Sequence, residues 1–167
     1  PVSAGGEGCD CRGFVTALAG EPAAAKIRTG GVQAGAFPMA REVAEFLTAC
    51  VAANVPFKAT AGLHHPVRGH YRLTYDANAP TAVMYGFLNV FMAAALAKVK
   101  GLPADEIEEI LTEEEPASFK FMDNVAAWRS HGIDTAQLAM VREGLALSFG
   151  SCSFDEPVED LRRMGLL

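Results

Sequence analysis

The chain has 167 residues, of which half are hydrophobic and a fifth are charged, and its formal net charge is −6. This length is typical of a single domain with a substantial core, and the composition argues against disorder. The acidic balance argues against general nucleic-acid binding, although it leaves room for a local basic pocket. We therefore expect a small molecule, not nucleic acid, as the partner.

The N-terminal segment, residues 1–13, is rich in glycine and is expected to be irregular. The chain starts at Pro1 without a methionine or a signal-like stretch, which is expected of a processed product or of a fragment. Cys9 and Cys11 form the one close cysteine pair, but a single intervening residue is poor spacing for structural zinc. Free thiols and a cytoplasmic location are therefore expected.

A strand–helix–strand unit is predicted in the first half of the chain, after a short helix at 14–20. Residues 23–31 have the apolar content of a short buried strand that ends in paired glycines. From Pro38 onward, apolar residues recur at helical spacing as far as Asn54, the expected stop. Residues 55–62 follow as a second strand, so the pattern is typical of a parallel βαβ unit.

In the second half of the chain, most of the predicted elements are helices. Residues 82–99 approach the length of a membrane span, but Asn89 and Gly86 favour a buried helix, which ends at Gly101. No membrane interaction is therefore expected. The remaining elements are expected at 102–116 (amphipathic helix), 117–123 (strand), 134–147 (helix with a capping box of Asp134 and Gln137), 147–154 (strand or turn) and 155–167 (helix).

Strands that alternate with helices predict an α/β fold with parallel βα units in one domain, residues 1–167. About four strands are expected, whereas a complete eightfold barrel needs roughly 250 residues. We expect the C-terminal part of a TIM-barrel-like fold, with a smaller open α/β sheet as the alternative. A part-barrel exposes strand edges, so a homo-oligomer or association with a missing N-terminal part is expected.

Candidate catalytic residues lie where two predicted strands end. Alternation along a strand places Lys26 and Arg28 on one face, and Lys58 and Thr60 likewise share a face. Two neighbouring buried lysines would repel each other, which favours a neutral amine able to form a Schiff base. The structural alternative is an ordinary lysine paired with a carboxylate such as that of Asp76 or Glu156.

The loops after these strands supply candidate substrate-binding residues. Gly30 and Gly31 could offer backbone N–H groups to a phosphate or a carboxylate, with the charge of Arg28 beside them. Thr29 belongs to the same turn, and Arg68 follows the second strand. Paired glycines are, however, also common in turns for conformational reasons alone.

Histidines cluster after the second strand, at His64, His65 and His70. In extended backbone His64 and His65 point in opposite directions, so one of them is expected to face the pocket. That histidine would act as a general acid or base, while three loop histidines leave metal binding as an alternative. Surface loop histidines without a role are the structural alternative.

Near the C-terminus, Cys152 lies among three serines and a glycine. The thiol would be a nucleophile if His64 or His65 came close to it. The alternative is a turn of small residues in front of a helix capped by Asp155. Tyr75 could line the same pocket, although packing is the commoner role of an aromatic residue.

Two short motifs carry a resemblance to a known family. The stretch FKATAG (57–62) resembles the Schiff-base lysine strand of deoxyribose-phosphate aldolases, and AKIRTGG (25–31) resembles their second lysine strand, with the two motifs in reverse order here. The resemblance implies that Lys58 forms the Schiff base and that Lys26 lowers its pKa. More broadly, AKIRTGG, FKATAGLHHP and FGSCSFDEP resemble an α/β-barrel-like bacterial family without an assigned activity.

These observations lead to three hypotheses. The first is a lyase or aldolase-like enzyme that acts on a small anionic carbonyl or sugar-phosphate-like substrate and needs no cofactor. The second is a metal-dependent enzyme that uses the loop histidines. The third is a non-catalytic domain that binds an anion or serves in assembly.

Overall fold

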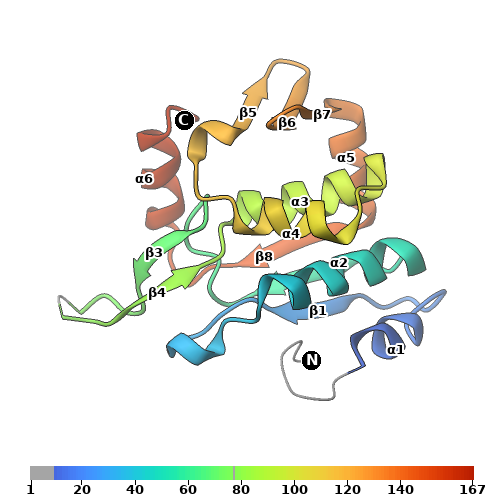
Figure 1. The fold of residues 1–167 in the computed structure, drawn as a ribbon, viewed down its shortest axis with the longest axis horizontal. Helices are drawn as coiled ribbons and strands as arrows, with labels where there is room; N and C mark the ends of the chain where they lie inside the picture. Colours follow the sequence, from blue (N-terminus) through green and yellow to red (C-terminus); the bar gives the residue numbers. More distant parts are fainter. Residues whose placement is uncertain (1–9, 77) are drawn as a thin grey trace.

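A three-stranded parallel sheet lies at the centre of the structure. The computed structural model describes residues 10–76 and 78–167. The strands of this sheet, in spatial order, are β1 (Ala25–Arg28), β2 (Phe57–Thr60) and β8 (Ala146–Gly150). Helices α2 (Ala40–Ala53) and α3 (Phe87–Lys100) lie together on one face of the sheet (Figure 1).

Alternating side chains explain why only one face of this sheet is covered. Ile27 and Phe57 are fully buried beneath the helices, whereas Lys26 and Lys58, next to them in sequence, are exposed. The Phe57 ring lies 5.6 Å from Phe46 of α2 and 6.5 Å from Phe91 of α3, measured between ring centroids. Both helices therefore pack on the same apolar face, and the opposite face carries charged side chains.

The predicted βαβ unit is confirmed. β1 and β2 pair in parallel, with Lys26 directly opposite Lys58, and α2 connects the two strands. Asn54 ends α2 in the left-handed conformation at φ 52°, as expected of a residue that can close a helix. The first helix, α1 (Cys11–Thr16), begins inside the segment predicted to be irregular. The rest of that prediction, residues 1–9 with Cys9, lies outside the described residues.

Part of the long apolar segment forms a strand instead of a helix. β3 (Gly69–Arg72) and β4 (Thr81–Met84) make an antiparallel hairpin in a region expected to be irregular. α3 begins only at Phe87 and ends, as predicted, at Gly101 with φ 66°. Among the described residues, no helix has both the length and the apolar character needed to cross a membrane.

The second half of the chain adds helices and a further sheet on the side of the parallel sheet where α3 lies (Figure 1). A second antiparallel sheet, of three strands, follows α4 (Ala104–Thr112). The first of these strands along the chain was predicted, at 117–123, whereas the other two were not. The capping box of Asp134 and Gln137 is confirmed at the start of α5, which ends at Gly144. The elements are β5 (Phe119–Met122), β6 (Val125–Trp128), β7 (His131–Asp134), α5 (Thr135–Gly144), α6 (Asp155–Arg163) and the short 3-10 helices η1 (Ala34–Ala36) and η2 (Pro116–Ser118).

The expected part-barrel is wrong. The described residues contain one small parallel sheet and two small antiparallel sheets, not a repeat of parallel βα units. The reason is the pairing partner of β2: its free edge is taken by β8, about ninety residues later, and not by the next strand in the chain. The intervening chain forms its own hairpin and its own three-stranded meander, so the parallel sheet ends at three strands.

A buried asparagine joins α3 to its neighbours. The amide nitrogen of Asn89 donates to the carbonyl oxygens of Ile110 (2.7 Å) and Glu113 (2.8 Å), which close the end of α4. Its Oδ1 atom accepts from the backbone N–H of Arg68 at 2.9 Å. Because Arg68 follows His64 and His65 in the same loop, Asn89 fixes the loop that carries both histidines.

Candidate functional site

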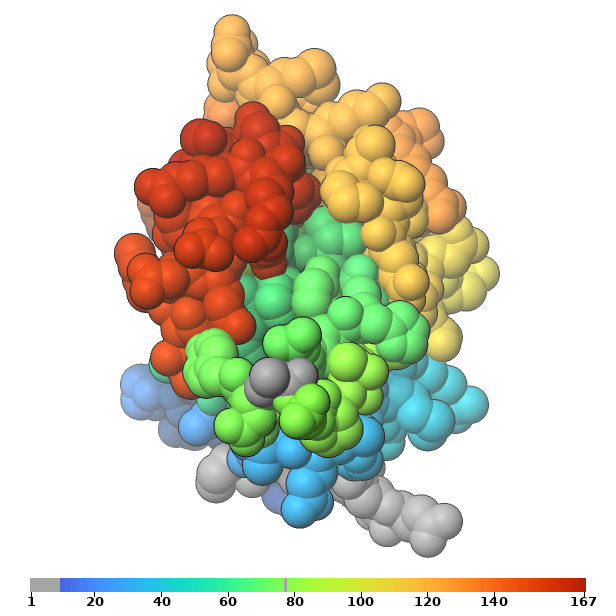
Figure 2. Space-filling model, turned by 90° about the vertical axis from the view of Figure 1, so that its left-hand side faces the viewer, coloured from blue at the N-terminus to red at the C-terminus, as the bar shows by residue number. Residues whose placement is uncertain are grey.

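A cavity of about 830 Å³ opens at the carboxyl ends of the three parallel strands. In Figure 2 the C-terminal residues and the β3–β4 hairpin lie beside each other on this face of the molecule. Seven of the side chains that line the cavity are charged groups, imidazoles or a thiol, and they come from four segments of the chain: Arg28, His64, His65, Arg72, Cys152, Glu156 and Arg163.

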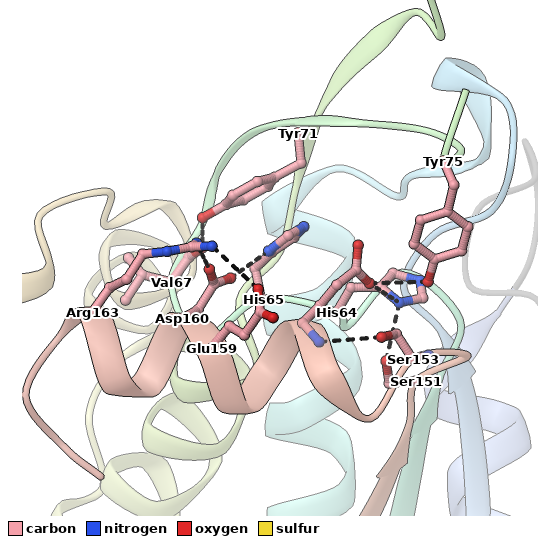
Figure 3. A network of polar contacts seen from close by, with 11 residues as sticks. His64, His65, Val67, Tyr71, Tyr75, Ser151, Ser153, Glu159, Asp160 and Arg163 are labelled. Atoms are coloured by element: carbon pink, nitrogen blue, oxygen red, sulfur yellow. Dashed lines mark hydrogen bonds and ion pairs between the residues drawn. The ribbon is translucent and has the colours of Figure 1, made fainter. Parts of the chain in front are cut away.

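His64 lies at the centre of a polar cluster on one wall (Figure 3). Its Nδ1 atom is 3.0 Å from the Ser151 hydroxyl oxygen and 3.7 Å from Glu156 Oε2. The Tyr75 hydroxyl donates to the same Glu156 oxygen at 3.2 Å. The Glu156 carboxylate favours a proton on Nδ1, which leaves Nε2 of the imidazole as the hydrogen-bond acceptor.

Cys152 Sγ lies close to both ring nitrogens of His64, at 3.6 Å from Nδ1 and 3.8 Å from Nε2. The nearly equal distances mean that the sulfur is not aligned with either nitrogen. Proton transfer therefore requires a side-chain rotation, which is common at catalytic groups before substrate binds. Cys152 is solvent-exposed, so a substrate in the cavity can reach the thiol.

The pKa of His64 is lowered from its usual value of 6.5. Burial disfavours the charged imidazolium, and the neighbouring His65 acts in the same direction, while Glu156 opposes both. His64 is consequently neutral near pH 7. A neutral imidazole beside a thiol can act as a general base.

His65 belongs to a second cluster on the neighbouring wall. Its Nδ1 atom is 2.6 Å from Asp160 Oδ2, and Asp160 is also paired with Arg163. The imidazole ring stacks on Tyr71, with 3.4 Å between ring centroids. Glu156 and Asp160, the carboxylates of the two clusters, both belong to α6 (Asp155–Arg163), and Figure 3 shows Asp160 on this helix. Both histidines thus line the cavity, whereas one was expected to face away.

The two lysines that were candidate catalytic groups do not line the cavity. Lys26 and Lys58 are exposed on the uncovered face of the sheet and are absent from the cavity lining. Thr60, two residues after Lys58, does line the cavity, as does Arg28, two residues after Lys26. The expected proximity of the lysines is confirmed, because they are direct partners in adjacent strands.

The glycine turn of β1 packs tightly against the loop after β2. The Gly30 backbone lies so close to Gly62 and to the Phe37 ring that a side chain on Gly30 would overlap both. Thr29 is completely buried and donates from its hydroxyl to the carbonyl oxygen of Ala61 at 2.6 Å. Thr29 and Gly30 therefore hold two loops together, while Gly31 lines the cavity.

Arg68 and His70 are directed elsewhere. Arg68 lies over the Tyr85 ring and 3.4 Å from Glu114, and it does not line the cavity. His70 is exposed on β3. Within residues 10–76 and 78–167, no group of three or more His, Cys, Asp or Glu side chains has an arrangement that could hold a metal ion.

Sequence reasoning missed the carboxylates that orient the two histidines. Glu156 was considered as a lysine partner only, and Asp160 was not considered. Their spacing of four residues on a predicted helix was an available signal, because it places both on one helix face.

Asp155 is the first residue of α6, and the cap that was expected from it is provided by Ser153, whose Oγ accepts from the Glu156 N–H at 3.2 Å.

The comparisons with known proteins add no assignment. No protein-family model matches the chain, and neither a curated protein nor a solved structure does.

Proposed function

We propose that the cavity is the active site of an enzyme that transfers or hydrolyses the acyl group of a small anionic compound, with Cys152 as nucleophile and His64 as general base. The supporting observation is that Cys152 and Glu156 both lie within 4 Å of the His64 imidazole, in an open cavity of about 830 Å³. A thiol, a neutral imidazole and an orienting carboxylate are the groups that acyl transfer through a thioester requires.

The reaction begins when Nε2 of His64 takes the thiol proton of Cys152. The sulfur forms a bond to the carbonyl carbon of the substrate, and the resulting tetrahedral intermediate breaks its bond to the leaving group. His64 returns the proton to that leaving group. Water then attacks the thioester with His64 again as base, which releases the acid and restores the thiol. Glu156 stabilises the imidazolium in both steps.

The charges around the cavity favour an anionic substrate. Arg28, Arg72 and Arg163 line it, and Arg163 alone of the three forms an ion pair within the described part of the chain. An anion bound beside Arg28 or Arg72 would place its reacting carbonyl near Cys152.

Trapping the acyl intermediate tests this proposal. The protein is incubated with thioesters of small dicarboxylic acids, quenched in acid and analysed by intact mass and peptide mapping. We expect one acyl adduct on the peptide that contains Cys152, absent in Cys152→Ser, and no adduct on the buried Cys50. An adduct that is unchanged in Cys152→Ser, or no adduct with any thioester, would contradict the proposed nucleophile.

A lyase that acts through Lys58 is the second candidate. The direct pairing of Lys26 with Lys58 supports it, because Schiff-base chemistry needs a lysine amine as nucleophile and the two lysines lie side by side in adjacent strands. The exposure of both lysines counts against it. Borohydride reduction in the presence of small aldehydes and keto acids separates the candidates, since a reduced adduct lost only in Lys58→Met would favour the lyase.

Location and assembly stay predictions from the sequence. We propose a cytoplasmic location, because a reactive thiol such as Cys152 persists in a reducing compartment. Self-association is proposed from the exposed strand edges, and sedimentation of the purified protein tests it.

A further inference from the structure

A row of cations extends from the cavity along the uncovered face of the parallel sheet. Lys26 and Lys58 are direct partners in β1 and β2, and Arg28 follows Lys26 on the same side of β1. We refer to Lys26, Arg28 and Lys58 as the basic strip. All three side chains are exposed, because the helices that cover the sheet lie on its other face.

Within the described residues, the basic strip has no carboxylate as an ion-pair partner. The polar contact found for the strip is a bond from Arg28 Nε to the Gly30 carbonyl oxygen at 2.9 Å. Ser148, the neighbour of Lys58 on β8, is also uncharged. In a chain of net charge −6, these three neighbouring cations form a local basic surface that attracts anions.

The geometry relates the strip directly to the cavity. Neighbouring strands are about 4.8 Å apart, so the two lysine stems can converge on a single anion. Residues two positions apart along a strand are separated by about 6.6 Å, so the Cα atoms of Lys26 and Arg28 lie about this far apart. Arg28 lines the cavity. A ligand that occupies the cavity can therefore extend a charged group past Arg28 onto the lysines.

The number and type of cations point to a phosphate. A phosphate monoester carries a charge close to −2 near neutral pH, and a pyrophosphate carries more. Lysine ammonium groups bind phosphate as compact point charges, whereas a single carboxylate is better matched by one bidentate arginine. Three cations spread over two strands suit a group with several negative oxygens.

We propose that the basic strip binds the phosphate or pyrophosphate group of a phosphorylated substrate whose acyl carbon lies in the cavity. This inference rests on the proposed acyl-transfer function, because it assigns the remainder of the same substrate. It gives Lys26 and Lys58 a binding role in place of a catalytic one. The expected substrate is thus longer than the cavity, with its charged end on the sheet face.

Calorimetric titration with inorganic pyrophosphate tests the strip. We expect wild-type protein to bind pyrophosphate and the double variant Lys26→Met/Lys58→Met to bind it at least about tenfold more weakly. The variant Lys26→Arg/Lys58→Arg retains the charge and should retain most of the affinity. The double variant Lys100→Met/Lys120→Met loses the same charge at exposed positions of α3 and β5, and it should bind like the wild type.

Two results would overturn the inference: no binding of pyrophosphate to the wild type at millimolar concentration, or equal weakening in the two methionine double variants. The second result would indicate attraction to the overall charge and not to the strip. Either failure is distinguishable from failure of the proposed function, since acylation of Cys152 by thioesters that lack phosphate is measured without pyrophosphate.

Discussion

Replacing Asn89 by leucine should be among the most destabilising changes in the protein. Leucine keeps the approximate volume but removes three hydrogen bonds to buried backbone groups, at Ile110, Glu113 and Arg68. Each bond contributes about 1 kcal/mol net, and a buried group left without a partner costs about 1–3 kcal/mol. The free energy of unfolding should therefore fall by about 3–5 kcal/mol.

Urea denaturation followed by circular dichroism measures this loss. With a slope of about 2 kcal/mol per molar urea, the midpoint should fall by about 1.5–2.5 M. Asn78→Leu, at an exposed position, is the control and should leave the midpoint nearly unchanged. Asn89→Asp keeps the shape but removes the amide donor, so it should be at least as destabilising as leucine. A loss below about 1 kcal/mol for Asn89→Leu would refute the role assigned to these hydrogen bonds.

Two further predictions concern stability. Gly86→Ala would place a methyl group against the carbonyl oxygen of Pro66, so it should lower the melting temperature markedly. At Gly144 nothing lies within 4 Å of the added methyl group, so Gly144→Ala should leave the melting temperature equal or higher. Similar melting temperatures for the two variants would contradict the close approach of the Gly86 backbone to Pro66. Burial alone would raise the pKa of Glu113, but hydrogen bonds that its carboxylate accepts, including those from Arg129, hold the pKa below the usual 4.5. The ionised Glu113 side chain therefore contributes its full stabilisation above pH 4.5 and loses it as the pH falls through the lowered pKa. The difference in unfolding free energy between the wild type and Glu113→Gln should thus shrink in acid. A difference that stays constant from pH 7 to pH 3 would contradict the lowered pKa of Glu113.

Local patterns in the sequence predicted the local parts of the fold. Asn54 and Gly101 ended their helices as expected, because left-handed helix closure depends on the residue itself. The capping box at Asp134 was predictable for the same reason. The hairpin of β3 and β4 was missed, because its strands are four residues long and are joined by a connection without a tight-turn motif.

The errors in fold and site arose from contacts between distant parts of the chain. Alternation placed Lys26 and Arg28 on one face correctly, but it could not tell whether helices cover that face. The pairing of β2 with β8 and the approach of Cys152 to His64 both join segments more than 80 residues apart. Neither pairing has a local signal, so the part-barrel was expected and Cys152 stayed an alternative to Lys58.

The most direct test of the proposed site is the rate of Cys152 alkylation by iodoacetamide between pH 5 and pH 9. Peptide-resolved mass spectrometry follows the wild type and His64→Gln, with the buried Cys50 as an internal control. We predict that Cys152 in the wild type reacts about tenfold faster at pH 7 than in the variant. This advantage should persist below pH 6.5 and disappear as His64 becomes protonated, because burial lowers the pKa of its imidazole. Equal rates in the two proteins across this pH range would contradict the account of His64 as the base that activates Cys152.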